Sequence, residues 1–137
     1  MGVWKRFEEF SNRPGKKGII YNKRTVGNEK EQIAAEYLKT AGYVILASNF
    51  FSRHGEIDLI ALDKEVLVFI EVKFRRDLIS GSPFEAVNLR KTRNITKAAR
   101  YYMYKHQISE DTPCRFDVVG IVGDEITLIQ NAFDAVM

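Results

Sequence analysis

Apolar residues recur along this chain first with the period of a helix and then in short, almost continuous runs that are typical of buried strands. The segment 28–42 predicts a helix that ends at Gly42. Its inward face would carry Ile33, Ala34, Tyr37, Leu38 and Ala41. Segments rich in β-branched and aromatic residues follow at 43–50, 56–62 and 67–74, and turn-forming residues separate them. These three segments predict strands.

The second half of the chain continues this alternation. A long helical pattern runs from about residue 84 to 106, and two strands are expected at 115–122 and 125–133, joined by a turn at Gly123 and Asp124. The second and third strands of the first group are apolar on both faces, so helices should cover both sides of the sheet. We therefore predict an α/β fold, a mixed β-sheet flanked by helices in the order αβββαββ.

The chain begins with a basic segment that has no core pattern of its own. Residues 1–24 carry seven basic and two acidic residues, whereas the rest of the chain carries 14 basic and 16 acidic residues. We divide the chain into a basic N-terminal extension, 1–26, and one globular domain, 27–137. The net charge of +3 comes from the extension. The overall basicity therefore does not by itself show that the domain binds nucleic acid.

Composition argues against several classes of protein. Cys114 is the only cysteine, so neither an internal disulfide nor a zinc-type cluster is expected, and a cytoplasmic location is favoured. No apolar run has the length of a membrane span, so no membrane association is expected. Motifs of Ser/His/Asp hydrolases and of phosphate-binding glycine-rich loops are absent from the sequence.

Charged side chains interrupt the two most apolar strands. Because side chains alternate along a strand, we expect Asp58 on the same face as Ile60 and Leu62. The same rule places Glu71 and Lys73 together in the next strand.

A four-residue hairpin loop at 63–66 would set the register between these strands. The resulting pairs are Leu62 with Leu67, Ile60 with Phe69, Asp58 with Glu71, and Glu56 with Lys73. Two carboxylates whose Cβ atoms lie about 4.5–5.5 Å apart repel each other unless a cation lies between them. A divalent cation held by Asp58 and Glu71, with Lys73 beside it, would meet this need. A structural ion-pair network, in which Glu56 pairs with Lys73 and Asp58 with an arginine, explains the same residues.

Glu31 is the only inward carboxylate of the first predicted helix. With Asn28 as N-cap it would form a capping box, which stabilises a helix start by about 1 kcal/mol. The alternative is that Glu31 approaches the carboxylates of the strands.

The long helix carries a stripe of one charge. Within an arc of roughly 80° lie Arg90, Arg93, Lys97, Arg100 and Tyr104. Between Ala86 and Glu110 there is no acidic residue, so the stripe repels itself and suits a polyanion. A merely solvated helix face is the alternative. Lys91 falls among the apolar residues instead, and either reaches the carboxylates or extends outward along the helix.

These segments together resemble a known family. The runs EQIAAEYLKTAGYVIL, GEIDLIALD, LVFIEVKFR, FEAVNLRKTRNITKAARYY and CRFDVVGI resemble the YraN family of predicted endonucleases, within the PD-(D/E)XK superfamily and close to archaeal Holliday junction resolvases. The resemblance covers about residues 27–133. It implies a restriction-endonuclease-like αβββαβ core. Related RecB-like nucleases also use a residue of the following helix, where Lys91 stands here.

The resemblance implies a reaction, a cofactor and a set of residues. By similarity the catalytic residues are Glu31, Asp58, Glu71 and Lys73, with the three carboxylates as ligands of Mg²⁺ or Mn²⁺. The reaction would be metal-dependent hydrolysis of DNA phosphodiester bonds, selective for branched or junction DNA, with RNA left open. Backbone phosphates would bind Arg75, Arg76, Arg90, Lys91, Arg93, Lys97 and Arg100.

Three further expectations stay open. A homodimer is expected only by analogy with resolvases, whose junctions have two-fold symmetry. One alternative is a non-catalytic nucleic-acid-binding accessory protein that keeps the nuclease fold. Another is an interaction adaptor that uses Trp4, Phe7 and Phe10 of the extension.

Overall fold

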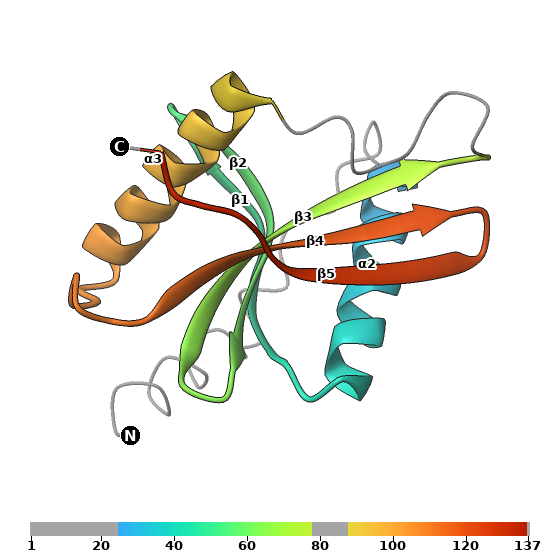
Figure 1. The fold of residues 1–137 in the computed structure, drawn as a ribbon, viewed down its shortest axis with the longest axis horizontal. Coiled ribbons are helices and arrows are strands. Elements are labelled where there is room, and N and C mark those ends of the chain that lie inside the picture. The colour runs from blue at the N-terminus through green and yellow to red at the C-terminus, as the bar shows by residue number, and fades with distance from the viewer. Residues whose placement is uncertain (1–24, 78–87, 137) are drawn as a thin grey trace.

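The structure, a computed structural model, describes residues 25–77 and 88–136. In these residues it contains two helices and five strands (Figure 1). In chain order they are α2 (Thr25–Thr40), β1 (Val44–Ser52), β2 (Gly55–Asp63), β3 (Val66–Arg75), α3 (Leu89–Lys105), β4 (Cys114–Val122) and β5 (Glu125–Phe133). The predicted α/β class and the order αβββαββ are confirmed. None of the helices in this part of the chain is long and apolar enough to cross a membrane.

Two predicted segments extend beyond the described residues. Residues 1–24 of the proposed extension lie outside them, so its separation from the domain stays a prediction. The expected start of the second helix near residue 84 also lies outside them. α3 begins at Leu89, after Asn88, whose side chain accepts a hydrogen bond from the Lys91 amide.

The five strands form one mixed sheet in the order β1-β2-β3-β4-β5. β3 and β4 are parallel, and the other neighbouring pairs are antiparallel. α3 makes the crossover that a parallel connection requires. In Figure 1 the strands fan out from a narrow waist, with α2 and α3 at opposite sides of the sheet.

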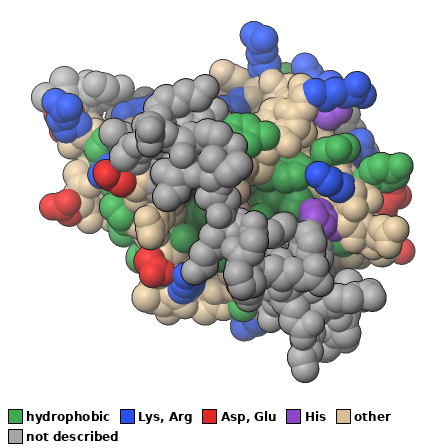
Figure 2. Space-filling view, turned by 180° about the vertical axis from the view of Figure 1, so that it is seen from behind, with side chains coloured by type: hydrophobic (Ala, Val, Ile, Leu, Met, Phe, Trp, Pro, Cys, Tyr) green, Lys and Arg blue, Asp and Glu red, His purple; other side chains and the backbone are tan. Residues whose placement is uncertain are grey.

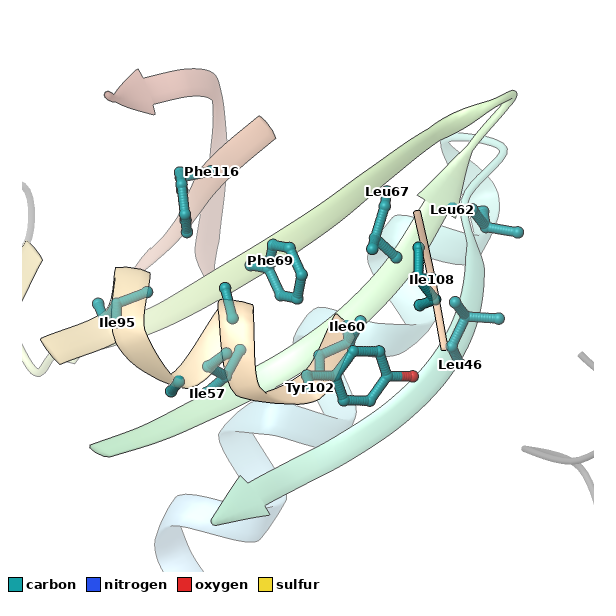
Figure 3. Close-up of a cluster of buried hydrophobic side chains, with 12 residues drawn as sticks. Leu46, Ile57, Ile60, Leu62, Leu67, Phe69, Ile95, Tyr102, Ile108 and Phe116 are labelled. Carbon is teal, nitrogen blue, oxygen red and sulfur yellow. The ribbon is translucent and has the colours of Figure 1, made fainter. Parts of the chain in front are cut away.

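Each helix covers one face of the sheet with its own apolar cluster. On the α3 face, Ile57, Ile60 and Phe69 pack with Ile95 and Tyr102 of the helix (Figure 3). The α2 face is formed by Ala34, Leu38, Tyr43, Leu59, Ala61, Val68, Ile70, Val119 and Ile121. Burial on both faces explains why β2 and β3 are almost continuously apolar.

The predicted hairpin register is confirmed for two of its four pairs, but the turn is shorter than predicted. Asp63 pairs with Val66, so the turn has two residues, 64 and 65, in place of the four expected. Leu62 pairs with Leu67, and Ile60 pairs with Phe69. The paired residues end at Leu59 and Ile70, so the predicted pairs of Asp58 with Glu71 and of Glu56 with Lys73 do not form part of the ladder.

The side-chain alternation of β2 breaks at Asp58. Ile57 packs on the α3 face together with Ile60, whereas Leu59 packs on the α2 face. The regular alternation that places Asp58 on the face of Ile60 and Leu62 therefore does not hold at this point of β2. The physical reason lies in β1, where Asn49 has a left-handed backbone with φ of 52°. Asn49 lies between the pairs that β1 forms with Leu59 and Ile57, with one residue on each strand, so a local departure from extended backbone, not an inserted residue, accompanies the change of face.

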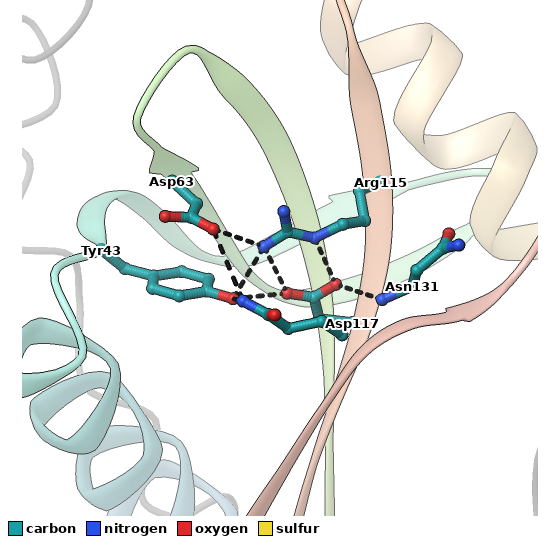
Figure 4. Close-up of polar contacts among 6 residues, drawn as sticks. Tyr43, Asp63, Arg115, Asp117 and Asn131 are labelled. Carbon is teal, nitrogen blue, oxygen red and sulfur yellow. Dashed lines mark hydrogen bonds and ion pairs between the residues drawn. The ribbon is translucent and has the colours of Figure 1, made fainter.

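A polar network crosses the sheet near the β2–β3 turn (Figure 4). Asp117 is fully buried and accepts hydrogen bonds from the Tyr43 hydroxyl at 2.7 Å, from Arg115 Nε at 2.8 Å and from the Asn131 amide at 2.9 Å. Arg115 also contacts Asp63 at 2.8 Å. Hydrogen bonds to Asp117 raise the pKa of the Arg115 guanidinium, so this group keeps its positive charge.

Candidate metal and nucleic-acid site

Asp58 lies at the point where β2 separates from β3. Its Oδ2 accepts a hydrogen bond from the Val72 amide at 2.7 Å. Because the β2–β3 ladder has ended one residue earlier, this carboxylate takes the place of a backbone acceptor. The end of the ladder therefore fixes Asp58 in the gap between the two strands.

Three carboxylates converge at this gap. One oxygen each of Glu31, Glu56 and Asp58 lies within 4.8 Å of the others, and all three residues are partly buried. α2 contributes Glu31, and β2 contributes Glu56 and Asp58. The structure thus brings together two of the predicted metal ligands, Glu31 and Asp58.

The capping-box interpretation of Glu31 is wrong. α2 begins at Thr25, so Asn28 lies inside the helix and is not its N-cap. Glu31 therefore lies in the second turn of α2, where its side chain joins the carboxylate cluster.

Glu56 was missed as a candidate ligand. Sequence reasoning paired it with Lys73, but Lys73 Nζ lies 3.4 Å from Glu71 Oε1 instead. The signal was present in the two-residue spacing of Glu56 and Asp58, which puts both side chains on one side of a strand.

The surroundings of Asp58 favour its protonated form. Burial raises the pKa of this carboxyl to about 8, and the nearby charges of Glu71, Glu31 and Glu56 act in the same direction. The hydrogen bond from Val72 opposes them. At neutral pH the metal-free cluster therefore holds a proton that a bound cation would replace.

Glu71 lies near enough to Asp58 for its charge to affect that carboxyl, and two lysines contact it. Its Oε1 lies 2.8 Å from Lys91 Nζ and 3.4 Å from Lys73 Nζ, and its side chain is 9% exposed. Lys91 thus reaches the carboxylates from α3, as one of the two sequence interpretations expected. Burial lowers the pKa of Lys73, with the neighbouring Lys91 acting in the same direction. For Lys91, contacts with Glu71 outweigh the effect of burial and raise the pKa.

The carboxylate cluster fits a small divalent cation. Mg²⁺ takes oxygen ligands at 2.0–2.1 Å, so neighbouring ligand oxygens lie about 3–4 Å apart. The separations within the cluster, at most 4.8 Å, need only small side-chain adjustments. Glu71 is available as a further ligand if Lys91 releases it.

The comparison with known proteins identifies the family. The model of the Uncharacterised protein family UPF0102 matches residues 30–121. The chain belongs to the UPF0102 family. A UPF0102 protein of Lachnoclostridium phytofermentans is 50% identical over 114 residues, which cover 83% of this chain and 97% of that protein. One of Clostridium botulinum is 45% identical over 119 residues, which cover 82% and 97%.

The residues that match the UPF0102 family include the whole candidate site. Glu31 lies one residue after the start of the match, and the gap between β2 and β3 and the N-terminal half of α3 fall inside it. The YraN family expected from the sequence is the UPF0102 family, so this membership is confirmed, whereas the PD-(D/E)XK superfamily and the endonuclease activity stay predictions. The description of the UPF0102 family names no activity, so any activity has to be inferred from the site.

The basic stripe of this UPF0102 protein is exposed on α3. Its cationic members are Arg90, Arg93, Lys97 and Arg100. The opposite side of α3 is buried, with Ile95, Ala98 and Tyr102 in the core.

The other predicted phosphate-binding residues differ in their surroundings. Lys91 points to Glu71 and is only one-third exposed. Arg75 is partly buried, with Nη1 donating to the Phe74 carbonyl at 2.8 Å, whereas Arg76 is exposed.

Proposed function

We propose that this UPF0102 protein is a metal-dependent endonuclease of the PD-(D/E)XK type that hydrolyses phosphodiester bonds of DNA. The observation that carries the proposal is the convergence of Glu31, Glu56 and Asp58 within 4.8 Å, beside a buried Glu71 held by Lys73 and Lys91. Acids with a strongly raised pKa beside lysines in a partly buried gap are typical of catalytic sites.

The carboxylates of Glu31, Asp58 and Glu71 would hold Mg²⁺ or Mn²⁺, with Glu56 as an additional ligand. When bound, such an ion stabilises the negative charge that develops on the phosphoryl oxygens and makes water a better nucleophile.

The two lysines would serve the reacting phosphate. Lys73 has a lowered pKa and lies at the end of β3, where it can orient a water molecule and donate a hydrogen bond to it. Lys91 would exchange Glu71 for a phosphate oxygen of the substrate, since its ammonium is partly exposed.

The basic stripe on α3 would bind the DNA backbone. Lys and Arg contacts to phosphates position a nucleic acid without reading its sequence, so selectivity would follow the shape of branched or junction DNA. A homodimer in the cytoplasm acting on two-fold symmetric junctions is part of this proposal.

The test is metal-dependent nicking by the purified protein. Branched, flapped and single-stranded DNA are incubated with Mg²⁺ or Mn²⁺, and matched RNA serves as a separate arm. We expect nicking by the wild type and at least a hundredfold loss in the double variant Asp58→Asn, Glu71→Gln, because single catalytic groups commonly contribute factors of 10² or more. The variant Asp124→Asn, Glu125→Gln, at the exposed β4–β5 turn, controls for the charge change. Equal nicking by both double variants would overturn the proposal.

The accessory-protein alternative has one observation in its favour, the pairing of Glu71 with two lysines in the metal-free protein. It predicts nucleic-acid binding without uptake of Mg²⁺. Titration calorimetry of the free protein with Mg²⁺ separates the two functions, because an endonuclease of this type must bind the ion at Asp58.

A further inference from the structure

Two exposed tyrosines lie on the same face of α3 as the basic stripe. Tyr104 is 81% exposed and Tyr101 is 40% exposed. At 100° per residue Tyr104 falls between Arg100 and Lys97, whereas Tyr101 lies about 40° beyond Lys97, at the border of the stripe and one helical turn from Lys97. The last two turns of this face are therefore both basic and aromatic.

Packing in the hydrophobic core does not explain why α3 has tyrosines at positions 101 and 104. The buried aromatic residue of this segment is Tyr102, which is 2% exposed and contacts Phe50 and Phe69 edge-on. The Tyr101 ring packs beside the Phe50 ring, with 6.1 Å between their centroids. This contact restricts the orientation of the Tyr101 ring, while a large part of the side chain faces solvent. Tyr104 projects beyond it.

The carboxylate site, the basic residues and the tyrosines follow one another along α3, as expected of a surface that binds one nucleic-acid strand along its length. Lys91 contacts the carboxylate site at the start of the helix, and Tyr104 follows 13 residues later, about 20 Å along the axis. A strand stacked as in duplex DNA carries one phosphate per about 3.4 Å of axis, so this length spans at most roughly six nucleotides, and fewer when the single strand is extended. Figure 2 shows Lys and Arg side chains interspersed with apolar side chains at the end of the molecule where α3 lies.

We propose that Tyr101 and Tyr104 form a stacking platform for unpaired bases, so that the substrate enters with a single-stranded DNA segment along α3. In a duplex the faces of the bases are already stacked, and a ring on a helix surface can stack only on an unpaired base. The neighbouring cations favour a polyanion over an apolar protein partner. The path to the carboxylates rests on the proposed endonuclease function, but the binding itself does not require cleavage.

Fluorescence anisotropy in EDTA tests the platform with the full chain. The probes are a 20-nucleotide single strand of mixed sequence, the same strand as a blunt duplex, and the corresponding RNA strand. The variants are Tyr104→Leu, Tyr104→Phe, Tyr101→Leu and Tyr101→Phe. Ile33→Ala on α2, a residue that is 42% exposed, is the control for loss of exposed apolar surface.

We expect each leucine variant to weaken single-strand binding by about 5- to 100-fold, the range for loss of one stacked base. The phenylalanine variants and Ile33→Ala should bind within about twofold of the wild type, and duplex binding should change little in all variants. Because Tyr104 is almost fully exposed, Tyr104→Leu keeps the test valid even if Tyr101→Leu loses stability through its contact with Phe50.

The inference is overturned if Tyr104→Leu leaves single-strand affinity unchanged or weakens single strand and duplex equally. It is also overturned if the wild type prefers the RNA strand alone, or if Tyr104→Leu abolishes a dimer in sedimentation analysis instead of DNA binding. Nicking without tyrosine-dependent binding would refute only the platform. Tyrosine-dependent binding without nicking would refute only the endonuclease.

Discussion

At the scale of single residues, we expect Asp58 to have the largest effect on how the stability of the protein depends on pH. Its pKa rises from 3.8 to about 8 in the folded protein, first because of burial and then because of Glu71. The folded state therefore keeps a proton that the unfolded state has released. This contribution to stability is fully present below about pH 4 and is lost as the pH rises through about 8.

We predict that the metal-free protein becomes steadily less stable between about pH 4 and pH 8, and that Asp58→Asn removes much of this dependence. Urea unfolding in EDTA at pH 5, 7 and 9 measures it. The amide that replaces the carboxyl group is neutral and cannot ionise, so the variant should be more stable than the wild type at pH 9. Asp124→Asn, on the exposed β4–β5 turn, is the control and should follow the wild type. Parallel pH profiles for wild type and Asp58→Asn would contradict the prediction.

Residue types and spacing identified the candidate site residues, but they did not predict which of these side chains contact each other. Spacing alone left Glu31 open between a helix cap and an approach to Asp58, whereas the family resemblance grouped the two carboxylates, which do lie together. Regular alternation fails around Asp58, where the neighbouring strand holds Asn49 in a left-handed conformation, and a pattern rule that assumes regular strands has no signal for such a residue. The pairing of Glu71 with Lys91 depends on where α3 crosses the sheet, which no local pattern specifies.

At the scale of elements, helices and strands were predictable because each buries a continuous apolar face. The register of β2 and β3 was also predictable over its apolar part, since a shift by one residue would turn every core side chain to the wrong face. The helix start at Thr25 was missed because the Asn28–Glu31 spacing is typical of a cap. Local signals thus located the elements better than their ends.

One buried acid of β4, Asp117, helps to hold this strand in the sheet. Asp117 is fully buried and accepts hydrogen bonds from Tyr43, Arg115 and Asn131. Removing the carboxylate would leave the buried Tyr43 phenol without its acceptor and the Arg115 guanidinium with Asp63 as its remaining carboxylate partner. We predict that Asp117→Ala lowers the free energy of unfolding by roughly 3–5 kcal/mol.

Urea denaturation followed by circular dichroism measures this loss. The transition midpoint should fall while the dependence on denaturant stays the same. Asp111→Ala, in the exposed loop before β4, should change stability by less than about 0.5 kcal/mol. A loss below about 1 kcal/mol for Asp117→Ala would show that the network contributes little to the fold.

At the scale of the whole molecule, the two helices divide the functions of the site between them. α2 supplies Glu31 from one face of the sheet, and α3 supplies Lys91 and the basic stripe from the other. The carboxylates meet where β2 and β3 separate, so both faces can contribute to one centre. Under the proposed function, this arrangement would join a cation site to a polyanion-binding surface through a single helix, α3.

The salt dependence of DNA affinity measures how many cations of the basic stripe contact phosphates. If the four stripe cations each neutralise one phosphate, log K for duplex DNA should fall with log salt concentration with a slope of about −3 to −4, since each phosphate contributes about −0.9. Lys97→Ala and Arg100→Ala should each make the slope shallower by about 1. Lys39→Ala, on the opposite helix and paired with Glu36, should leave it unchanged. A slope that Lys97→Ala and Arg100→Ala do not alter would mean that DNA binds elsewhere, and the division of roles between the two helices would then be wrong.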